Sequence, residues 1–392
     1  MEKQNPFGGI FTGKTVLITG HTGFKGSWLS IWLKLLGANV VGYSRDPAIE
    51  KKQRNFRLCR LSERITHLIG HIRDLDILKK TVEDHKPEVV IHMAAQPLVN
   101  ISYQEPKRTF DTNVAGTVNI LEAIRQTKSV KAFIGVTTDK VYEDQRWVWG
   151  YRENDPLGGY DPYSASKAMV ELAIQSYRRS WQEKWKEEGI EKSFSDHPVS
   201  IASARAGNVI GGGDFSKYRL VPDCMKALMD EKPILLRNPD SVRPWQHVLE
   251  PLGGYLWLAA NMLQQTDEEY SDAWNFGPSE HEAVTCETAA KEAIDLWGSG
   301  SYQSMAAGTS KRHETYILRL NWVKAATRLD WRPTYSWEQA MKATVDWFKE
   351  YQRQGGGSTS APTTVDMCEF CYRQIQQYMA SASAQGIKWV NP

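Results

Sequence analysis

The sequence predicts an α/β fold in which a parallel β-sheet, covered by helices on both faces, is followed by a smaller, mostly C-terminal α/β lobe. Three observations predict this arrangement. Strand-like and helix-like segments alternate through the first half of the chain, as they do in doubly wound parallel sheets. A glycine-rich turn joins the first strand to the first helix. From about residue 207 the composition changes, with three consecutive glycines followed by frequent proline and tryptophan.

The first strand, turn and helix form the most clearly marked unit. Residues 14–19 predict a short buried strand, and residues 27–36 predict an amphipathic helix. Between them, Gly20, Gly23 and Gly26 permit a tight turn and a close approach of the backbone to a pyrophosphate, which the positive helix N-terminus attracts. The spacing is G-x-x-G-x-x-G and not the G-x-G-x-x-G of many dehydrogenases, and an ordinary strand–helix loop is the alternative interpretation.

The other elements follow in alternating order. A long amphipathic helix is predicted over residues 109–127, and a later helix carries Tyr163 and Lys167. Parallel strands end at one edge of their sheet, so ligands are expected to bind at that edge. Five more strands are predicted, over residues 39–43, 66–70, 88–93, 132–136 and 199–204.

Two lobes are predicted from this pattern. A Rossmann-type dinucleotide-binding domain takes residues 1–206, and a second lobe with the C-terminal tail takes residues 207–392. Segments near 244–280 are expected to return to the first domain. The charged stretch 181–192 is expected to form a solvated helix extension or an insertion, and the glycine- and serine-rich residues 355–360 form a linker to a tail that docks as one helix.

Two short motifs carry the chemistry. Tyr163 and Lys167 are four residues apart, which places both side chains on one face of a helix. An ammonium group beside a tyrosine favours the phenolate and lowers the tyrosine pKa from about 10. Tyr163 is therefore a candidate general base for a hydroxyl whose carbon loses hydride. Asp139 and Lys140 follow the strand at 132–136 and add a second acid–base pair, which a simple oxidation does not need.

Composition excludes several classes of function. The formal net charge of the 392 residues is +2, so nothing indicates binding to nucleic acid or to a membrane surface. The apolar runs are too short to span a bilayer, no signal peptide is evident, and a cytoplasmic location is expected. Cys368 and Cys371 have C-x-x-C spacing, but the other cysteines are scattered and the histidines form no metal-binding cluster, so we predict no metal site and a helix-packing role for the pair.

The chain resembles the extended short-chain dehydrogenases/reductases and, within them, the nucleotide-sugar 4,6-dehydratases that act on CDP-glucose. Related dehydratases acting on dTDP- or GDP-sugars have glutamate where this chain has Lys140, which favours the CDP-glucose branch. The resemblance covers nearly the whole chain, in the motifs GHTGFKGSWLS (20–30), HMAAQPLV (92–99), TTDKVY (137–142), WVWGYREN (147–154), GGYDPYSASK (158–167), RAGNVIGGGDF (205–215), RPWQHVLEPLGGY (243–255) and WNFGP (274–278).

The resemblance implies a reaction in which NAD is reduced and reoxidised within one turnover, in deoxysugar biosynthesis of the lipopolysaccharide type. Tyr163 would take the proton of the sugar 4-hydroxyl, Thr138 would bond the same hydroxyl, and Lys167 would hold the nicotinamide ribose and lower the Tyr163 pKa. Asp139 would protonate the departing 6-hydroxyl. An ammonium beside Asp139 lowers the carboxyl pKa, so Lys140 is either a neutral base at C5 or a charged group that stabilises the enolate.

The cofactor residues are also implied by the resemblance. Ser44 and Arg45 stand where an acidic residue would bind the NAD ribose, and they could instead receive the 2′-phosphate of NADP. NAD is favoured because the family recycles it within the reaction, and NADP is the less favoured alternative. His71 stands where the family commonly has aspartate. The expected cofactor-binding residues are Gly20, Thr22, Gly23, Phe24, Lys25, Gly26, Ser44, Arg45, Asp74, Leu75, Met93, Ala94, Ala95, Gln96, Asn113, Val136, Tyr163, Lys167 and Arg205.

The expected substrate contacts lie mainly in the second lobe. Asn208 and Arg243 are the strongest candidates because a diphosphate needs donors and positive charge. Arginines and histidines here could instead form surface or interlobe pairs. The expected residues are Gln96, Ser102, Thr138, Asn208, Arg219, Leu220, Leu235, Arg237, Arg243, His313, Glu314 and Tyr316.

Two alternative functions remain open from the sequence. A nucleotide-sugar 4-epimerase shares the fold, NAD and the Tyr163–Lys167 pair, but it needs no acid for a leaving hydroxyl. A sensor that binds a dinucleotide without turnover would not need Thr138, Tyr163 and Lys167. By analogy with the family, a homodimer or homotetramer is expected, with the helices at 109–127 and 163–179 packed against their symmetry mates.

Overall fold

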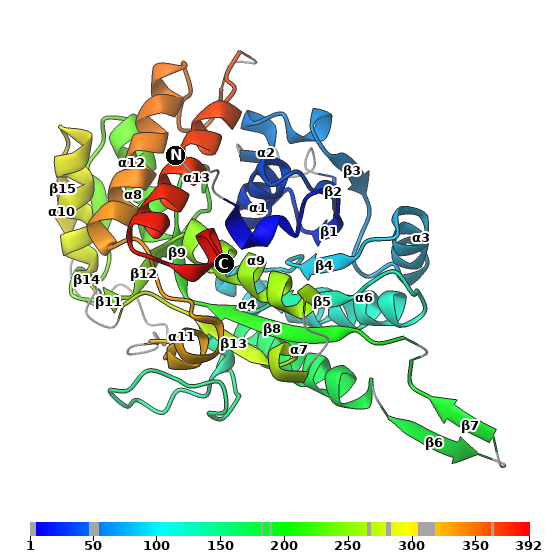
Figure 1. Cartoon of the computed structure of the whole chain (residues 1–392). Helices are drawn as coiled ribbons and strands as arrows, with labels where there is room; N and C mark the ends of the chain where they lie inside the picture. The colour runs from blue at the N-terminus through cyan, green and yellow to red at the C-terminus, as the bar shows by residue number, and fades with distance from the viewer. Residues whose placement is uncertain are drawn as a thin grey trace.

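A seven-stranded parallel sheet runs through the molecule, which is described here by a computed structural model (Figure 1). The structure describes residues 5–46, 55–181, 183–187, 190–195, 197–264, 268–279, 284–304, 318–361 and 364–392. The strand order is β13-β8-β5-β4-β1-β2-β3, which confirms the predicted doubly wound fold. The strands are β1 (Thr15–Thr19), β2 (Asn39–Ser44), β3 (Thr66–Ile69), β4 (Val89–His92), β5 (Ala132–Val136), β8 (Ser200–Ala206) and β13 (Ala273–Phe276).

The two faces of the sheet carry separate apolar cores, because successive strand residues point to opposite sides. Val16 and Ile18 of β1 face one core, which is built with the helices α1 (Phe24–Leu35), α9 (Leu249–Gln264) and α13 (Cys368–Ala384). Leu17 faces the other core. That second core is built with α3 (Leu75–His85), α6 (Gly116–Arg125) and α7 (Pro162–Ser180).

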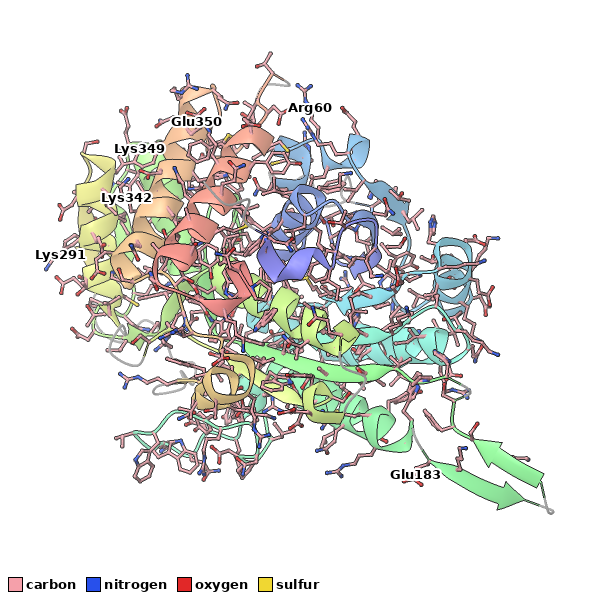
Figure 2. All side chains as sticks on the ribbon, viewed as in Figure 1. Arg60, Glu183, Lys291, Lys342, Lys349 and Glu350 are labelled. Carbon is pink, nitrogen blue, oxygen red and sulfur yellow. The ribbon has the colours of Figure 1, made fainter. Side chains whose placement is uncertain are left out.

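The second lobe lies beside the carboxyl edge of the sheet. Its helices are α8 (Leu220–Met229), α10 (Cys286–Trp297) and α12 (Trp337–Arg353). Its short strands pair as β10 (Ile234–Leu236) with β15 (Tyr302–Ser304), β11 (Val242–Arg243) with β14 (Val284–Thr285), and β9 (Asn208–Ile210) with β12 (Trp245–His247). In Figure 2 the labelled lysines of α10 and α12 lie at the periphery of the molecule. The division of the chain into two lobes at residue 206 stays a prediction. The expected return of later segments to the first domain is seen in β13, which joins the sheet, and in α9, which covers one of its faces.

The C-terminal tail docks back on the first helix of the chain. After α13, a short 3-10 turn, η7 (Lys388–Val390), places Trp389 on Phe7 with ring centroids 5.0 Å apart and nearly parallel planes. Trp32 of α1 meets Tyr378 of α13 edge to face at 5.7 Å. The Tyr378 hydroxyl donates to the buried Glu250 carboxylate at 2.9 Å. Trp32 and Trp389 therefore pack the tail against α1.

Two segments differ from the predicted elements. Beyond α7 the charged stretch forms a hairpin of β6 (Lys184–Glu187) and β7 (Ile190–Ser193), which projects from the body with Glu183 at its base. It is an insertion and not a helix extension, because α7 ends at Ser180 and the next backbone groups pair between the strands.

The helix predicted over 109–127 is also interrupted. It consists of α5 (Pro106–Phe110), a π-helical turn η4 (Asp111–Ala115) and α6. Such π turns often occur beside functional sites. Among the residues that the structure describes, no helix is long and apolar enough to cross a membrane.

Candidate active site

A cavity of about 1690 Å³ opens at the carboxyl edge of the sheet, between the strand ends and the second lobe. The structure brings most of the predicted site residues to its wall. His313, Glu314 and Tyr316 lie outside the described residues. The predicted residues that line the cavity are Gly20, Thr22, Gly23, Phe24, Lys25, Gly26, Ser44, Arg45, Met93, Ala94, Ala95, Val136, Thr138, Asp139, Lys140, Tyr163, Lys167, Asn208, Arg219, Leu220, Leu235, Arg237 and Arg243.

The glycine turn is shaped for close approach of a ligand to the backbone. Gly20 has φ +78°, and a Cβ there would lie 2.8 Å from the Ala94 nitrogen. A Cβ on Gly26 would lie 2.3 Å from the Gly20 oxygen. Neither position accepts a side chain without a backbone shift. The turn leaves the N-terminus of α1 facing the cavity, where its free N–H groups and positive dipole suit a pyrophosphate.

Lys25 follows this turn and lies inside the cavity. Withdrawal from bulk water, together with the nearby charges of Arg219 and Lys167, lowers the pKa of Lys25 from its usual value to about 7. An anion bound in the cavity would relieve this repulsion. The position is therefore prepared for a negatively charged ligand.

The adenosine end of the cavity differs from the sequence prediction. The expected residues Asp74 and Leu75 do not line it, whereas His71 and Ile72 do. The reason is local: Asp74 is the N-cap of α3, and its side chain accepts a hydrogen bond from the Ile77 nitrogen at 3.1 Å. His71 stands where the family commonly has aspartate. This position was the signal in the sequence that could have placed the predicted contact at residue 71, three residues before Asp74.

Ser44 and Arg45 do line this end of the cavity, as expected. The Ser44 hydroxyl lies 3.0 Å from the Thr22 hydroxyl, which ties the end of β2 to the glycine turn. His21, in the same turn, packs on Gly42 and bonds His67 at 2.7 Å. Burial and the neighbouring His67 lower the His21 pKa to about 3, so His21 is a neutral packing residue.

Gln96, Ser102 and Asn113 are corrections, because none of them lines the cavity. Asn113 accepts a bond from the Gln96 backbone nitrogen at 2.7 Å, and the Gln96 amide donates to Thr109 Oγ1 at 3.0 Å. The Ser102 hydroxyl donates to the Val99 carbonyl at 2.8 Å within its own helix. These side chains fix the loop after β4, and the cavity is instead lined there by Leu98, Val99, Asn100, Ile101 and Tyr103.

The start of α7 positions the tyrosine–lysine pair. Asp161 caps this helix by accepting bonds from the Ser164 nitrogen and hydroxyl at 3.0 and 2.6 Å. Tyr163 therefore stands in the first turn at the cavity wall, with Lys167 one turn behind it. The Lys167 ammonium donates to the Val136 carbonyl, at the end of β5, at 2.9 Å.

The pKa of Tyr163 does not follow the sequence prediction. Burial raises it to about 12, and the groups that oppose this rise are the hydrogen bond with Thr138 and the charge of Arg219. Lys167 is turned to the Val136 carbonyl instead of the phenol. The expectation that Lys167 lowers the tyrosine pKa is therefore wrong for the protein without ligands.

Asp139 lies in a short 3-10 turn, η5 (Asp139–Val141), at the end of β5. Thr138 Oγ1 donates to its carboxylate at 2.8 Å, and Gly207 lies so close that a Cβ there would be 3.0 Å from the carboxylate. Burial raises the Asp139 pKa, and it outweighs the opposing charge of Lys140. Burial thus favours the protonated form of Asp139 that a general acid requires, against the charge of Lys140.

Arg205 is also a correction. Arg205 was expected to contact the cofactor, but it does not line the cavity, and only 3% of the residue is exposed. Its guanidinium pairs with Glu171 of α7 at 2.8 Å and donates to the Tyr142 hydroxyl at 2.7 Å. The strand residue before it in sequence, Ala204, faces a core, so Arg205 points to the opposite side.

The second lobe supplies a mainly cationic wall. Asn208, Arg219, Arg237 and Arg243 line it together with Leu220 and Leu235. Arg219 pairs with the buried Asp214 at 3.3 Å. Sequence reasoning missed Asp214, Tyr218 and Asp223, which also line this wall.

The cysteines are less scattered than the sequence indicated. Cys59 Sγ lies 3.9 Å from Cys371 Sγ, so the C-x-x-C helix packs on residues near the cavity. The described residues contain no cluster able to hold a metal ion.

Comparison with known proteins places the chain in a family. A family model described as GDP-mannose 4,6 dehydratase matches residues 17–344. The chain is 42% identical over 375 residues to a CDP-glucose 4,6-dehydratase of Salmonella typhimurium, covering 95% of this chain and 98% of the relative. It is 24% identical over 349 residues to a dTDP-glucose 4,6-dehydratase of Xanthomonas campestris, covering 85% and 93%.

Solved structures share the fold. The dTDP-glucose 4,6-dehydratase DesIV of Streptomyces venezuelae, with NAD bound, has a TM-score of 0.71 and 22% identity over 88% of this chain and all of the relative. A UDP-glucose 4-epimerase of Thermotoga maritima has a TM-score of 0.69 and 22% identity, covering 86% and 99%. The chain belongs to the GDP-mannose 4,6 dehydratase family, within the extended short-chain dehydrogenases/reductases.

Proposed function

We propose that the protein is an NAD-dependent hydro-lyase that converts CDP-glucose to CDP-4-dehydro-6-deoxyglucose, in deoxysugar biosynthesis. The observation that carries the proposal is the buried Asp139, placed in the same cavity as Tyr163 and Lys167 with its pKa raised. A protonated acid beside the oxidation site suits the loss of a hydroxyl, which an epimerase does not need. The 42% identity with a CDP-glucose 4,6-dehydratase supports the choice of nucleotide.

The residues at the carboxyl edge of the sheet fit NAD. The turn from Gly20 to Gly26 would hold the pyrophosphate, Ser44 and Arg45 the adenosine ribose, and Lys167 the nicotinamide ribose. NAD, when bound, would take hydride from the sugar and return it. The related dehydratase DesIV has NAD bound, so we propose NAD over NADP. Identification of the cofactor released from the denatured protein tests this choice.

The chain's own groups would handle the protons. Tyr163 would accept the proton of the 4-hydroxyl, with Thr138 bonding the same oxygen. Because burial holds the Tyr163 pKa near 12, this role needs positive charge beside the phenol in the loaded site, which Lys167 is placed to supply. Asp139 would protonate the departing 6-hydroxyl. Lys140 lines the cavity next to it and would act at C5, as a base or by stabilising negative charge.

The second lobe would bind the nucleotide. Arg219 and Arg243 would pair with the diphosphate, with Asn208 and Lys25 as further donors. Leu220 and Leu235 would contact the base, and Arg237, directly after β10, lines the same wall.

We also propose a homodimer formed through α5, α6 and α7. Met169 and Leu172 on α7 are apolar side chains with 45% and 53% of their surface exposed, which suits a helix-bundle interface. Sedimentation of the purified protein tests this proposal. The cytoplasmic location stays a prediction.

Product analysis with CDP-, dTDP-, UDP- and GDP-glucose in parallel tests the function. We expect a 4-keto-6-deoxy product from CDP-glucose alone or at the highest rate. With deuterium at C4 of the substrate, the label should appear in the C6 methyl group. CDP-galactose as the product would establish an epimerase, and bound NAD with no turnover of any substrate would indicate a sensor.

A further inference from the structure

A buried carboxylate stands directly behind the catalytic lysine. Glu171 follows Lys167 by four residues on α7, so the two side chains lie on the same face of the helix one turn apart. Glu171 does not line the main cavity and is 3% exposed. The chemistry proposed above does not use it, so its burial requires another explanation.

Three donors hold this carboxylate in one position. Glu171 accepts hydrogen bonds from Thr137 Oγ1, from Ser203 Oγ at 2.6 Å and from Arg205 Nη2 at 2.8 Å. Burial disfavours its charge, but Arg205 and the two hydroxyls outweigh burial, and the Glu171 pKa lies below its usual value. Glu171 is therefore ionised, and its donors are Thr137, directly after β5, and Ser203 and Arg205 of β8.

Arg205 is itself held in place from the other side. Its second nitrogen donates to the Tyr142 hydroxyl at 2.7 Å and to the Glu153 carbonyl at 3.0 Å. The Tyr142 hydroxyl in turn donates to Asn275 Oδ1 at 2.8 Å, on β13. The ion pair is thus connected by hydrogen bonds to three strands, which makes Glu171 a fixed charge and not a mobile one.

Lys167 needs such a charge nearby. Burial lowers the Lys167 pKa from its usual value to about 8, and Glu171 is the group that raises it. The other titratable groups around Lys167 do not supply the negative charge that Glu171 supplies. Lys25 of α1 is a cation or neutral. His92 of β4 is neutral with a pKa near 3, and Tyr163 is a neutral phenol.

We infer that Glu171 is a positioning residue whose carboxylate, fixed by Arg205, keeps Lys167 protonated and seated on the Val136 carbonyl. It acts through Lys167 and does not touch the substrate or the cofactor. A charged lysine one helical turn from Tyr163 is what the proposed oxidation needs, so the inference rests on the proposed function for its consequence in catalysis. Its effect on the lysine itself does not depend on which substrate is used.

The direct test is the protonation of Lys167. Competitive labelling with acetic anhydride over a range of pH, followed by peptide mass spectrometry, gives the titration midpoint of this single lysine. In Glu171→Gln we expect the midpoint to move to lower pH by about one unit. In Glu171→Asp, which keeps the charge but sets it further away, we expect a smaller shift in the same direction.

The matched control is Glu153→Gln. Glu153 is a half-buried carboxylate near Arg205, and it accepts a bond from the Asn275 nitrogen at 2.9 Å, but it does not lie on α7 behind Lys167. We expect no shift of the Lys167 midpoint in this variant. A shift equal to that of E171Q would overturn the inference, and so would an unchanged midpoint in E171Q. If E171Q does not fold, an unchanged midpoint in E171D overturns it.

Turnover supplies the second readout. The alkaline limb of the kcat–pH profile should move to lower pH by the same amount in E171Q, with rescue in E171D, whereas KM should change little. If the wild-type protein does not turn over CDP-glucose, the proposed function fails, and the labelling midpoints still decide the role of Glu171.

Discussion

The two walls of the cavity are built in different ways. On the sheet side, Thr138, Asp139 and Lys167 are buried and held by short hydrogen bonds at the ends of strands. On the side of the second lobe, Leu235 and Arg243 stand on short strands and Arg237 directly follows one, and all three are half-buried or exposed. Rigid, desolvated groups can be given unusual pKa values, whereas exposed cations mainly supply attraction. The sheet side is thus suited to chemistry and the lobe side to choosing and holding the nucleotide.

The sharpest test of this contrast is Tyr163→Phe. Loss of the phenol oxygen should lower kcat by roughly 1,000-fold, because general acid–base groups contribute about 100- to 10,000-fold, while KM for CDP-glucose stays within a few-fold. Steady-state kinetics with the NAD-loaded enzyme measures both. A large rise in KM with kcat preserved would show that the sheet side also dominates binding.

Asp139→Asn should separate two parts of the reaction. The asparagine amide cannot donate a proton to the leaving hydroxyl, so turnover should fall by about 100-fold. Reduced cofactor should accumulate at the same time, and its absorbance measures this accumulation. Because burial raises the Asp139 pKa, the wild-type acid is protonated below that pKa, and dehydration should slow as the pH rises through it. Absence of reduced cofactor in the variant would assign Asp139 to the oxidation step instead.

Arg243→Ala tests the lobe side. Removal of one cation facing the diphosphate should raise KM by about tenfold, as expected for a charge-assisted hydrogen bond worth about 1.5 kcal/mol, with kcat within twofold. Arg328→Ala is a suitable control, because Arg328 is an exposed arginine that does not line the cavity. An equal loss in kcat would mean that the lobe positions the sugar for chemistry as well.

The smallest effect is expected for Leu235→Ala. This side chain is 60% exposed, so truncation should raise KM only about twofold, from the small apolar area that a bound base would cover. The ratio of kcat/KM for CDP-glucose and UDP-glucose should be unchanged. A changed ratio would make Leu235 a determinant of base choice.

Much of the molecule could be predicted from the sequence because local rules suffice there. Strand β1, the glycine turn and α1 are adjacent in the chain, and their positions are decided by apolar spacing and by the glycines. Tyr163 and Lys167 share a helix face for the same reason. The predicted strands agree with the observed ones to within two residues.

Side-chain direction was harder to predict. Gln96, Ser102 and Asn113 lie close in sequence to residues that line the cavity, but their own hydrogen bonds hold the loop after β4 and the helix that follows it. Asp74 serves as a helix cap. Such choices depend on which partner is within reach after folding, and spacing along the chain does not specify that partner.

By itself, the sequence determined the order of strands and helices, the glycine turn and the helix face shared by Tyr163 and Lys167, since each depends on neighbours within a few residues. Only the tertiary structure decided that Asp139 is protonated more readily than a free carboxyl and that Glu171 and Arg205 pair behind Lys167. Both depend on burial and on groups from distant strands. Exclusion of water, which sets these charges, is a property of the packed molecule and not of any one segment.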